Sequence, residues 1–199
     1  MTEEIAILRK DILKYFDKQN EIPGEKVKLS TSGLYYYAVF KYKQANPKRN
    51  CLICKIEIWV TETYKKIFEY LSDSTDNEDS AIWIKKNGTE YLLLPEFAGG
   101  YSVFDTTTYK LHSYYSTADP FIWTGIFPSP SVDKIAVNGC YWGCPDELRV
   151  FDTKNIISLP YKMIYQIINV TNEAAFEHWE DDNTMVICKN KKDIMRIGV

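Results

Sequence analysis

The sequence predicts a mainly β fold of antiparallel four-stranded repeats, with one α-helix at the N-terminus. Three observations predict it: many aromatic residues, short runs that alternate apolar and polar side chains, and a strand motif that recurs along the chain. The chain has 199 residues, of which 15 are Tyr, 9 are Phe and 5 are Trp. Aromatic and β-branched side chains favour pleated strands. A chain of this length can bury a core without disulfides or a metal, so we expect a single domain over residues 1–199.

Residues 1–22 have the pattern of an amphipathic helix. Apolar residues recur at spacings of three and four and form one stripe: Ile5, Leu8, Ile12, Leu13 and Phe16. Such a stripe is typical of a helix that packs on a core. Pro23-Gly24 predicts the end of this helix. We expect the helix to cap the sheets, and the alternative is that it binds a partner.

From residue 25 to residue 199, one strand motif recurs with a period of about 45 residues. Its aromatic position is occupied by Trp59, Phe104 and Phe151. The four occurrences are Ile56–Lys65, Tyr101–Lys110, Leu148–Thr153 and the shorter Met195–Val199. The period predicts about four copies of one structural unit.

The residues upstream of each motif recur as well. An aromatic-bearing strand comes first, at residues 81–84, 121–124 and 176–179, and a second apolar strand follows at residues 91–94, 134–137 and 185–188. The turn Asn87-Gly88 between two of them is a strong hairpin signal. A polar turn and a further strand follow the motif. Each unit therefore has about four antiparallel strands in some 45 residues, which is the size of a propeller blade.

Residues 121–152 contain these elements in order. They comprise the Phe-x-Trp strand at 121–123, the turn Ser129-Pro130-Ser131, the strand Ile135-Ala136-Val137 and the strand Arg149-Val150-Phe151-Asp152. This order resembles a blade of the WD-repeat family or of a related β-propeller, and the resemblance extends over roughly residues 30–199. It implies a small or partial β-propeller.

Four units are the lower limit for a closed propeller. One alternative is a four-blade ring in which Lys26–Ser30 complete the last blade. The other is an open arc, whose exposed strand edges the helix or a partner must cover.

Charge and cysteine content limit the partners and the compartment. The net charge of −3 argues against nucleic acid, because binding to phosphates requires clustered Lys and Arg. No run approaches the ~20 apolar residues of a membrane span, so we expect no membrane partner. The first twenty residues have no apolar run of the length that a signal sequence needs. Five cysteines, an odd number, then indicate free thiols in a reducing compartment, and we expect a cytoplasmic protein.

Two Asp-Thr pairs, Asp105-Thr106 and Asp152-Thr153, occupy equivalent positions in the repeat. Side chains of these types bond to turn amides at strand ends. Because catalytic residues are normally singular, the repetition favours a structural role for both pairs.

No motif predicts catalysis, a cofactor or a metal. Cys51 and Cys54 have CxxC spacing, and Cys140 and Cys144 add two thiols that could hold zinc in principle. Residues three apart in a strand point to opposite faces, so we expect free thiols instead. The two histidines have no recognisable nucleophile beside them, and no glycine-rich phosphate loop is present.

The segment from Cys140 to Pro145 is the most unusual in composition. We expect Tyr141, Trp142, Asp146 and Glu147 to be binding residues, because exposed Tyr and Trp are favoured contact anchors. The alternative is a loop whose aromatic rings fold over the neighbouring repeat.

These observations predict a non-enzymatic protein-interaction module whose partner is another protein. A carbohydrate-binding or small-ligand-binding protein is the alternative, and a hydrolase is a weaker one. The aromatic platforms for a bound ring would be Tyr35, Tyr36, Tyr37, Tyr114 or Trp142.

Overall fold

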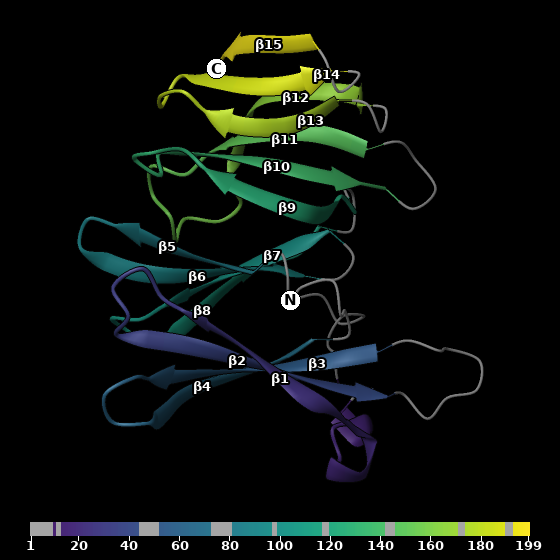
Figure 1. The fold of residues 1–199 in the computed structure, drawn as a ribbon, viewed down its shortest axis with the longest axis vertical. Coiled ribbons are helices and arrows are strands. Elements are labelled where there is room, and N and C mark those ends of the chain that lie inside the picture. Colours follow the sequence, from purple (N-terminus) through teal and green to yellow (C-terminus); the bar gives the residue numbers. More distant parts are fainter. Residues whose placement is uncertain are drawn as a thin grey trace.

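The computed structural model describes residues 10, 13–43, 52–72, 81–96, 99–116, 120–141, 146–170, 174–189 and 193–199. They form four antiparallel sheets, which follow one another along the chain and stack along the long axis of the molecule (Figure 1). The mainly β, repeated fold predicted from the sequence is confirmed.

Within each sheet the strands lie in sequence order. Sheet 1 contains β1 (Glu21–Leu29), β2 (Tyr35–Lys43), β3 (Leu52–Val60) and β4 (Lys65–Ser72). Sheet 2 contains β5 (Ile82–Lys86), β6 (Thr89–Glu96), β7 (Gly100–Asp105) and β8 (Lys110–Tyr114). Sheet 3 contains β9 (Ile122–Pro128), β10 (Lys134–Cys140), β11 (Asp146–Asp152) and β12 (Lys162–Val170). Sheet 4 contains β13 (Ala174–Trp179), β14 (Thr184–Lys189) and β15 (Asp193–Gly198).

The central strands of sheets 2 and 3 are buried on both faces. Leu92 and Leu94 of β6 pack against sheet 1, whereas Leu93 between them packs against sheet 3. Ala136 of β10 likewise faces sheet 4, whereas its neighbour Ile135 faces sheet 2. Successive side chains of a strand point to opposite faces, so an uninterrupted apolar run is what a strand between two sheets requires.

A tryptophan near each junction joins successive sheets. Trp83 of β5 lies against Tyr35 and Tyr37 of sheet 1, with ring centroids 6.3 and 6.1 Å away. Its indole N–H also donates to the carbonyl of Lys28 at 3.2 Å. In sheet 4, the indole N–H of Trp179 donates to the carbonyl of Phe127 in sheet 3 at 2.9 Å.

The helix predicted over residues 1–22 is not supported: Lys10 is helical, but the described residues from Leu13 onward form no α-helix. Leu13–Tyr15 and Lys18–Asn20 form two single 3-10 turns, and β1 begins at Glu21. Pro23-Gly24 does not end a helix but lies in an irregular part of β1, where Gly24 has a φ of +124°. The apolar stripe suggested a helix, yet Phe16 packs edge-on against Tyr42 at 5.2 Å. Residues 1–9, 11 and 12 lie outside the described part.

The closed four-blade ring is also not observed. Lys26–Leu29 pair with β2 as the first strand of sheet 1 and do not complete sheet 4. Sheets 1 and 4 lie at opposite ends of the stack (Figure 1). The arrangement is therefore the open alternative.

Hydrogen bonds from the turn between β1 and β2 connect sheet 1 to sheet 2. Glu90 of β6 accepts bonds from the Ser30 hydroxyl at 2.8 Å, the Ser32 amide at 2.7 Å and the Ser32 hydroxyl at 2.6 Å. Burial alone would raise the pKa of Glu90, but the bonds from Ser32 and Ser30 outweigh it and hold the pKa below its ordinary value.

A similar hydrogen bond from a turn to a carboxylate connects sheets 3 and 4. Ser131, in the turn that corresponds to the β1–β2 turn, donates its amide to Asp182 at 2.8 Å. This bond holds the pKa of Asp182 below its ordinary value. The turns match in detail, since Gly33 and Val132 both have positive φ, at 75° and 61°.

Replacing Glu90 by Gln should lower the free energy of unfolding at neutral pH by about 1–3 kcal/mol, because charged hydrogen bonds are lost. Because the pKa of Glu90 is lower in the folded protein than the reference value of 4.5, its contribution is complete above pH 4.5 and is lost as the pH falls below it. Urea unfolding of both proteins as a function of pH checks this. Glu62→Gln, at an exposed turn position, is the control, and an equal loss at pH 7 and pH 3 in Glu90→Gln would contradict the prediction.

Candidate functional site

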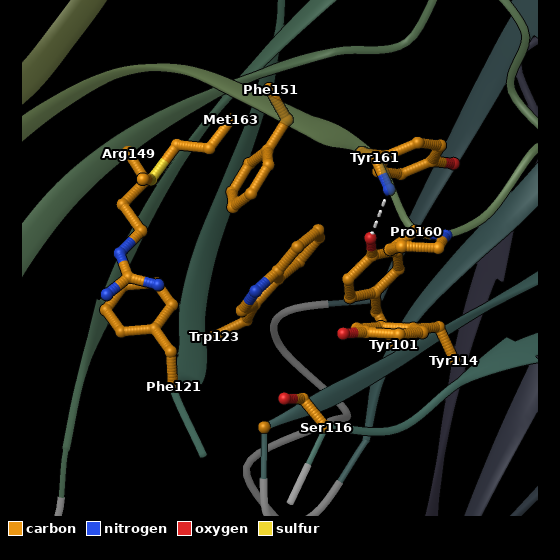
Figure 2. Close-up of a pocket in the computed structure, with 11 residues that line it drawn as sticks. Tyr101, Tyr114, Ser116, Phe121, Trp123, Arg149, Phe151, Pro160, Tyr161 and Met163 are labelled. Atoms are coloured by element: carbon orange, nitrogen blue, oxygen red, sulfur yellow. Dashed lines mark hydrogen bonds between the residues drawn. The ribbon is translucent and has the colours of Figure 1, made fainter. Parts of the chain in front are cut away.

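A crevice of about 140 Å³ lies between sheets 2 and 3 (Figure 2). Aromatic rings make up most of its wall, and one arginine is its only charged lining group among the described residues. The lining residues are Gly99, Tyr101, Tyr114, Ser116, Phe121, Trp123, Arg149, Phe151, Pro160, Tyr161 and Met163.

The rings of the crevice stack on one another across the junction. Tyr101 of sheet 2 lies between Trp123 and Tyr161 of sheet 3, with centroids 4.3 and 5.0 Å away and interplanar angles of 20° and 18°. Phe151 continues the stack at 5.4 Å from Trp123. Most of the aromatic surface is therefore used within the protein.

A buried hydrogen bond fixes this stack. The Tyr161 amide donates to the Tyr101 hydroxyl at 2.6 Å (Figure 2). Burial raises the pKa of both tyrosines well above the usual range. The buried bond and the ring contacts together hold sheets 2 and 3 against each other.

Arg149 forms the second part of the crevice. Its guanidinium lies 3.8 Å from the centroid of the Phe121 ring, and Figure 2 shows the two stacked. It donates to the Glu147 carboxylate at 3.1 Å and to the Tyr141 hydroxyl at 2.5 Å. Gln166 donates to the same carboxylate at 2.8 Å. A buried arginine of this kind is paired with a carboxylate and cannot act as an isolated anion site.

The structure brings two of the four predicted binding residues together. Tyr141 and Glu147 meet at Arg149, and the Tyr141 ring packs edge-on against Phe121 at 5.6 Å. Asp146 is exposed at the start of β11. Trp142 lies outside the described residues. Sequence reasoning missed Arg149, although its spacing of two from Glu147 in a strand places both on one face.

The three consecutive tyrosines of β2 separate to opposite faces. Tyr37 is fully buried, and its hydroxyl donates to the carbonyl of Ala81 at 3.0 Å. Tyr35 stacks on Trp83, also toward sheet 2. Only Tyr36 points to the outer face of sheet 1.

Val27, Leu29, Tyr36 and Trp59 lie on that outer face, and we call these four residues the end face. Strand register places Leu29, Tyr36 and Trp59 side by side across β1, β2 and β3. The rings of Tyr36 and Trp59 are almost parallel, at 4° and 6.2 Å. Val27 and Leu29 are 53% and 62% exposed, whereas the apolar residues of the internal junctions are buried.

Charges beside the end face are paired with one another. Glu57 is bonded to Lys55 at 3.0 Å and to Lys66 at 3.2 Å, and Lys66 also reaches Glu69 at 2.8 Å. Burial alone would raise the pKa of Glu57, but the two lysines outweigh it and hold that pKa below its ordinary value. The border of the end face is therefore electrically balanced.

Sheet 4 has a different outer face. Val186 lies at its centre and is only 2% exposed, flanked in register by His178 and Arg196. Arg196 forms an ion pair with Glu180 at 2.7 Å. The same face also displays an apolar residue, because Ile194, two positions from Arg196 in β15, is 67% exposed.

Other sequence predictions concern thiols, metals and turns. In the described part of the chain, no three His, Cys, Asp or Glu residues come together in a way that could hold a metal. Cys54 is buried, and Cys140 and Cys188 are partly buried. Cys51 and Cys144 lie outside the described residues. No helix among the described residues has the length and apolar character to cross a membrane.

The structural role predicted for the two Asp-Thr pairs is confirmed. Asp105 accepts from the Thr107 amide at 2.8 Å, and Asp152 accepts from the Lys154 amide at 3.0 Å. The Thr106 and Thr153 hydroxyls donate to carbonyls of the adjacent hairpin at 2.7 and 2.8 Å. Both pairs therefore shape turns.

The sequence matches no protein family and no curated protein, but solved structures match the fold. KlAtg21, in its complex with the coiled-coil of AgAtg16, aligns with 89% of this chain at a TM-score of 0.52 and 14% identity. The acylaminoacyl peptidase of Pyrococcus horikoshii aligns with 88% at 0.53 and 10% identity, and Sqt1 of Chaetomium thermophilum with 87% at 0.51 and 11% identity. The chain covers 54%, 32% and 44% of those chains, respectively, and so spans between a third and about half of their length.

The sheets are propeller-like blades. The matching structures include WD40 propellers, so the resemblance based on residues 121–152 is confirmed at the level of the fold. At 10–14% identity the likeness shows the fold alone.

Gly139→Ala should destabilise the junction of sheets 2 and 3. A Cβ at Gly139 would lie 2.3 Å from the Ile122 carbonyl oxygen and 2.5 Å from the Phe121 ring. We expect a loss of about 1–3 kcal/mol in the free energy of unfolding, as for overpacked cores, measured by urea denaturation. Gly198→Ala is the matched control, because no heavy atom lies within 4 Å of its Cβ position. Equal stability of the two variants would contradict the described packing.

Tyr101→Phe should keep the ring stack but leave the Tyr161 amide without its acceptor. An unsatisfied buried donor costs about 1–3 kcal/mol, and thermal and urea unfolding should both show the loss. Tyr109→Phe, on a ring that is 50% exposed, should have no measurable effect. Unchanged stability in Tyr101→Phe would mean that the bond adds nothing to the junction.

Proposed function

We propose that this chain is a non-enzymatic protein-interaction module and that the end face of sheet 1 is its main contact surface. The observation that carries the proposal is the exposure of Val27 and Leu29, at 53% and 62%, beside the stacked rings of Tyr36 and Trp59. Exposed aliphatic side chains clustered with aromatic rings are typical of a protein contact.

The other sheets show how unusual this face is. Sheets 2 and 3 are covered on both sides by neighbouring sheets, and sheet 4 has Arg196 and His178 on its free face. In sheet 1, exposed aliphatic side chains lie beside aromatic ones that are aligned across three strands. KlAtg21, one of the similar structures, is in complex with a coiled-coil, which supports a protein as the partner here.

Binding of a sugar or small ligand in the crevice is less well supported. Stacking on a ligand ring requires a free aromatic face, whereas the faces of Tyr101 are occupied by Trp123 and Tyr161. Arg149 is paired with Glu147. A protein partner on the end face explains the exposed surface better.

The loop residues Tyr141, Trp142, Asp146 and Glu147 remain a second proposed contact. Tyr141 is partly buried and Asp146 is exposed, so this region can offer an aromatic ring and an acidic group to a partner. Its contribution is separable from that of the end face by substitution.

The test is an affinity capture of the tagged chain from the lysate of its own source, quantified by mass spectrometry. Leu29→Asp places a charge in the end face and should reduce the captured partner at least about tenfold, as expected for loss of a contact anchor. Ile194→Asp is the matched control, because Ile194 is a 67% exposed apolar residue on sheet 4. Tyr141→Ala/Trp142→Ala tests the loop in the same experiment.

A partner that is retained by wild type and Ile194→Asp but lost in Leu29→Asp supports the end face. Loss only in Tyr141→Ala/Trp142→Ala would transfer the contact to the loop. Equal capture by all variants, or no protein held by the wild type, would contradict the proposed interaction function.

A further inference from the structure

We propose that β15 of sheet 4 binds an extended segment of a partner protein, which pairs with it antiparallel as a fourth strand. This site lies at the opposite end of the stack from the end face and is separate from it (Figure 1). Sheets 1, 2 and 3 each have four strands, whereas the described part of sheet 4 has three. We call the side of β15 away from β14 the open edge, because no described strand pairs with it.

Backbone groups of β15 point toward the position of a fourth strand. Residues of an antiparallel strand alternate, directing their N–H and C=O first to one neighbour and then to the other. The Val199 amide donates to the carbonyl of Asn183 at 2.8 Å, where the pairing of β15 with β14 ends. Alternation from Val199 therefore directs the backbone groups of Ile194, Arg196 and Gly198 to the open edge. A row of such groups is a template for another strand.

The equivalent strand of sheet 3 uses these groups to pair with its fourth strand. The Thr153 amide makes the corresponding bond across its hairpin at 2.8 Å. Alternation from Thr153 directs the backbone groups of Val150 away from β10, and Val150 pairs with Tyr165 of β12. Arg196 takes the place of Val150 in sheet 4, where no described strand pairs with that side of it.

The exposure of Met195 reflects the open edge and not the uncovered outer face of sheet 4. Met195 points toward sheet 3, since it lies opposite Ile187 of the cluster that sheets 3 and 4 share, yet it is 45% exposed. The corresponding residues Ser102 and Arg149 also face the preceding sheet, but they are 0% and 5% exposed. Each of them has a fourth strand beside it. An added strand would therefore cover Met195.

The preceding sheet determines which side chains the segment should carry. Sheets 3 and 4 stack with their first strands together, since the rings of Phe176 and Phe127 lie 4.4 Å apart, so β12 extends beyond β15. Tyr165 and Ile167 of β12 pack toward sheet 4 and are only half-buried. In sheet 2, Leu111 of the fourth strand packs on the cluster shared with sheet 1. The segment should likewise direct an aliphatic side chain at every second position toward sheet 3.

A second copy of this chain fits the open edge less well. Every other described strand is already paired within its own sheet. Two β15 strands paired around a two-fold axis would meet an obstacle, because β12 of each copy extends over the strand that the other copy would add. An extended segment of another protein meets no such obstacle, and its main-chain hydrogen bonds would supply affinity.

The test selects peptides of about ten residues, which is long enough to form a strand, from a random library displayed on phage against the full chain. A selected peptide is then titrated by fluorescence anisotropy. Arg196→Pro removes the outward N–H but no bond to β14, and it should raise the dissociation constant at least about tenfold. Arg196→Ala is the matched control, because it keeps that N–H, and its dissociation constant should stay within about threefold of the wild type.

Hydrogen exchange gives a second measurement that needs no variant, in case circular dichroism shows that Arg196→Pro does not fold. In the free chain, the Arg196 amide should exchange quickly, whereas the Val150 amide should be protected by β12. The bound peptide should slow exchange at Ile194, Arg196 and Gly198 at least about tenfold. Methylation of the peptide nitrogens that face β15 should abolish binding, and methylation of the alternate nitrogens should not.

Binding that Arg196→Pro weakens and Arg196→Ala keeps, with slowed exchange at the open edge, supports the inference. Protection of the Arg196 amide in the free chain, failure to select a peptide, or binding unaffected by Arg196→Pro and by methylation would overturn it. A dimer that sedimentation detects and Arg196→Pro breaks would also overturn it, because a second copy would then fill the edge. Leu29→Asp should leave the peptide bound, so this inference and the proposed end-face contact can fail independently.

Discussion

Burial of the central strands on both faces is the constraint on which the structure depends. Leu92, Leu93 and Leu94 are all fully buried, although alternate side chains of β6 point in opposite directions. Neither sheet 2 nor sheet 3 could be stable in water without a neighbour on each side, since each would expose an apolar face. The stack is therefore cooperative across its junctions, and its two outermost faces must be either polar or covered.

Specific contacts at each junction then set how the sheets are placed. The carboxylates of Glu90 and Asp182 are held by equivalent turns of the preceding sheet. Tryptophans from three sheets reach the sheet before them, and the middle junction adds the stack around Tyr101. The hydrophobic contacts favour stacking of the sheets, but they do not determine how one sheet is positioned on the next. The buried hydrogen bonds, from Ser30 to Glu90 and from Tyr161 to Tyr101, contribute most to the relative placement, because a buried donor without its acceptor would be costly.

The local patterns of the sequence predicted much of this fold. Uninterrupted apolar runs at residues 91–94 and 134–137, and the turn Asn87-Gly88, directly reflect strand burial and hairpin geometry. The N-terminal stripe predicted a helix through residue 22, but the described residues Leu13–Tyr15 and Lys18–Asn20 form 3-10 turns, and Phe16 packs on Tyr42 of sheet 1. Contacts between strands could not be predicted from the sequence. Glu147 and Arg149 share a strand face, but their contact with Tyr141 depends on how β10 and β11 align.

The end face is a second feature that the sequence alone could not identify. In the sequence, Tyr35, Tyr36 and Tyr37 are equivalent candidates for a contact surface, and only strand direction separates them. Tyr35 and Tyr37 help to bury the junction with sheet 2, so the middle tyrosine has to point the other way, toward Trp59. The core on one side of β2 thus determines which aromatic groups its other side displays. The stacking of Tyr36 on Trp59 restricts both side chains before a partner binds, and such preorganisation reduces the entropy lost on binding.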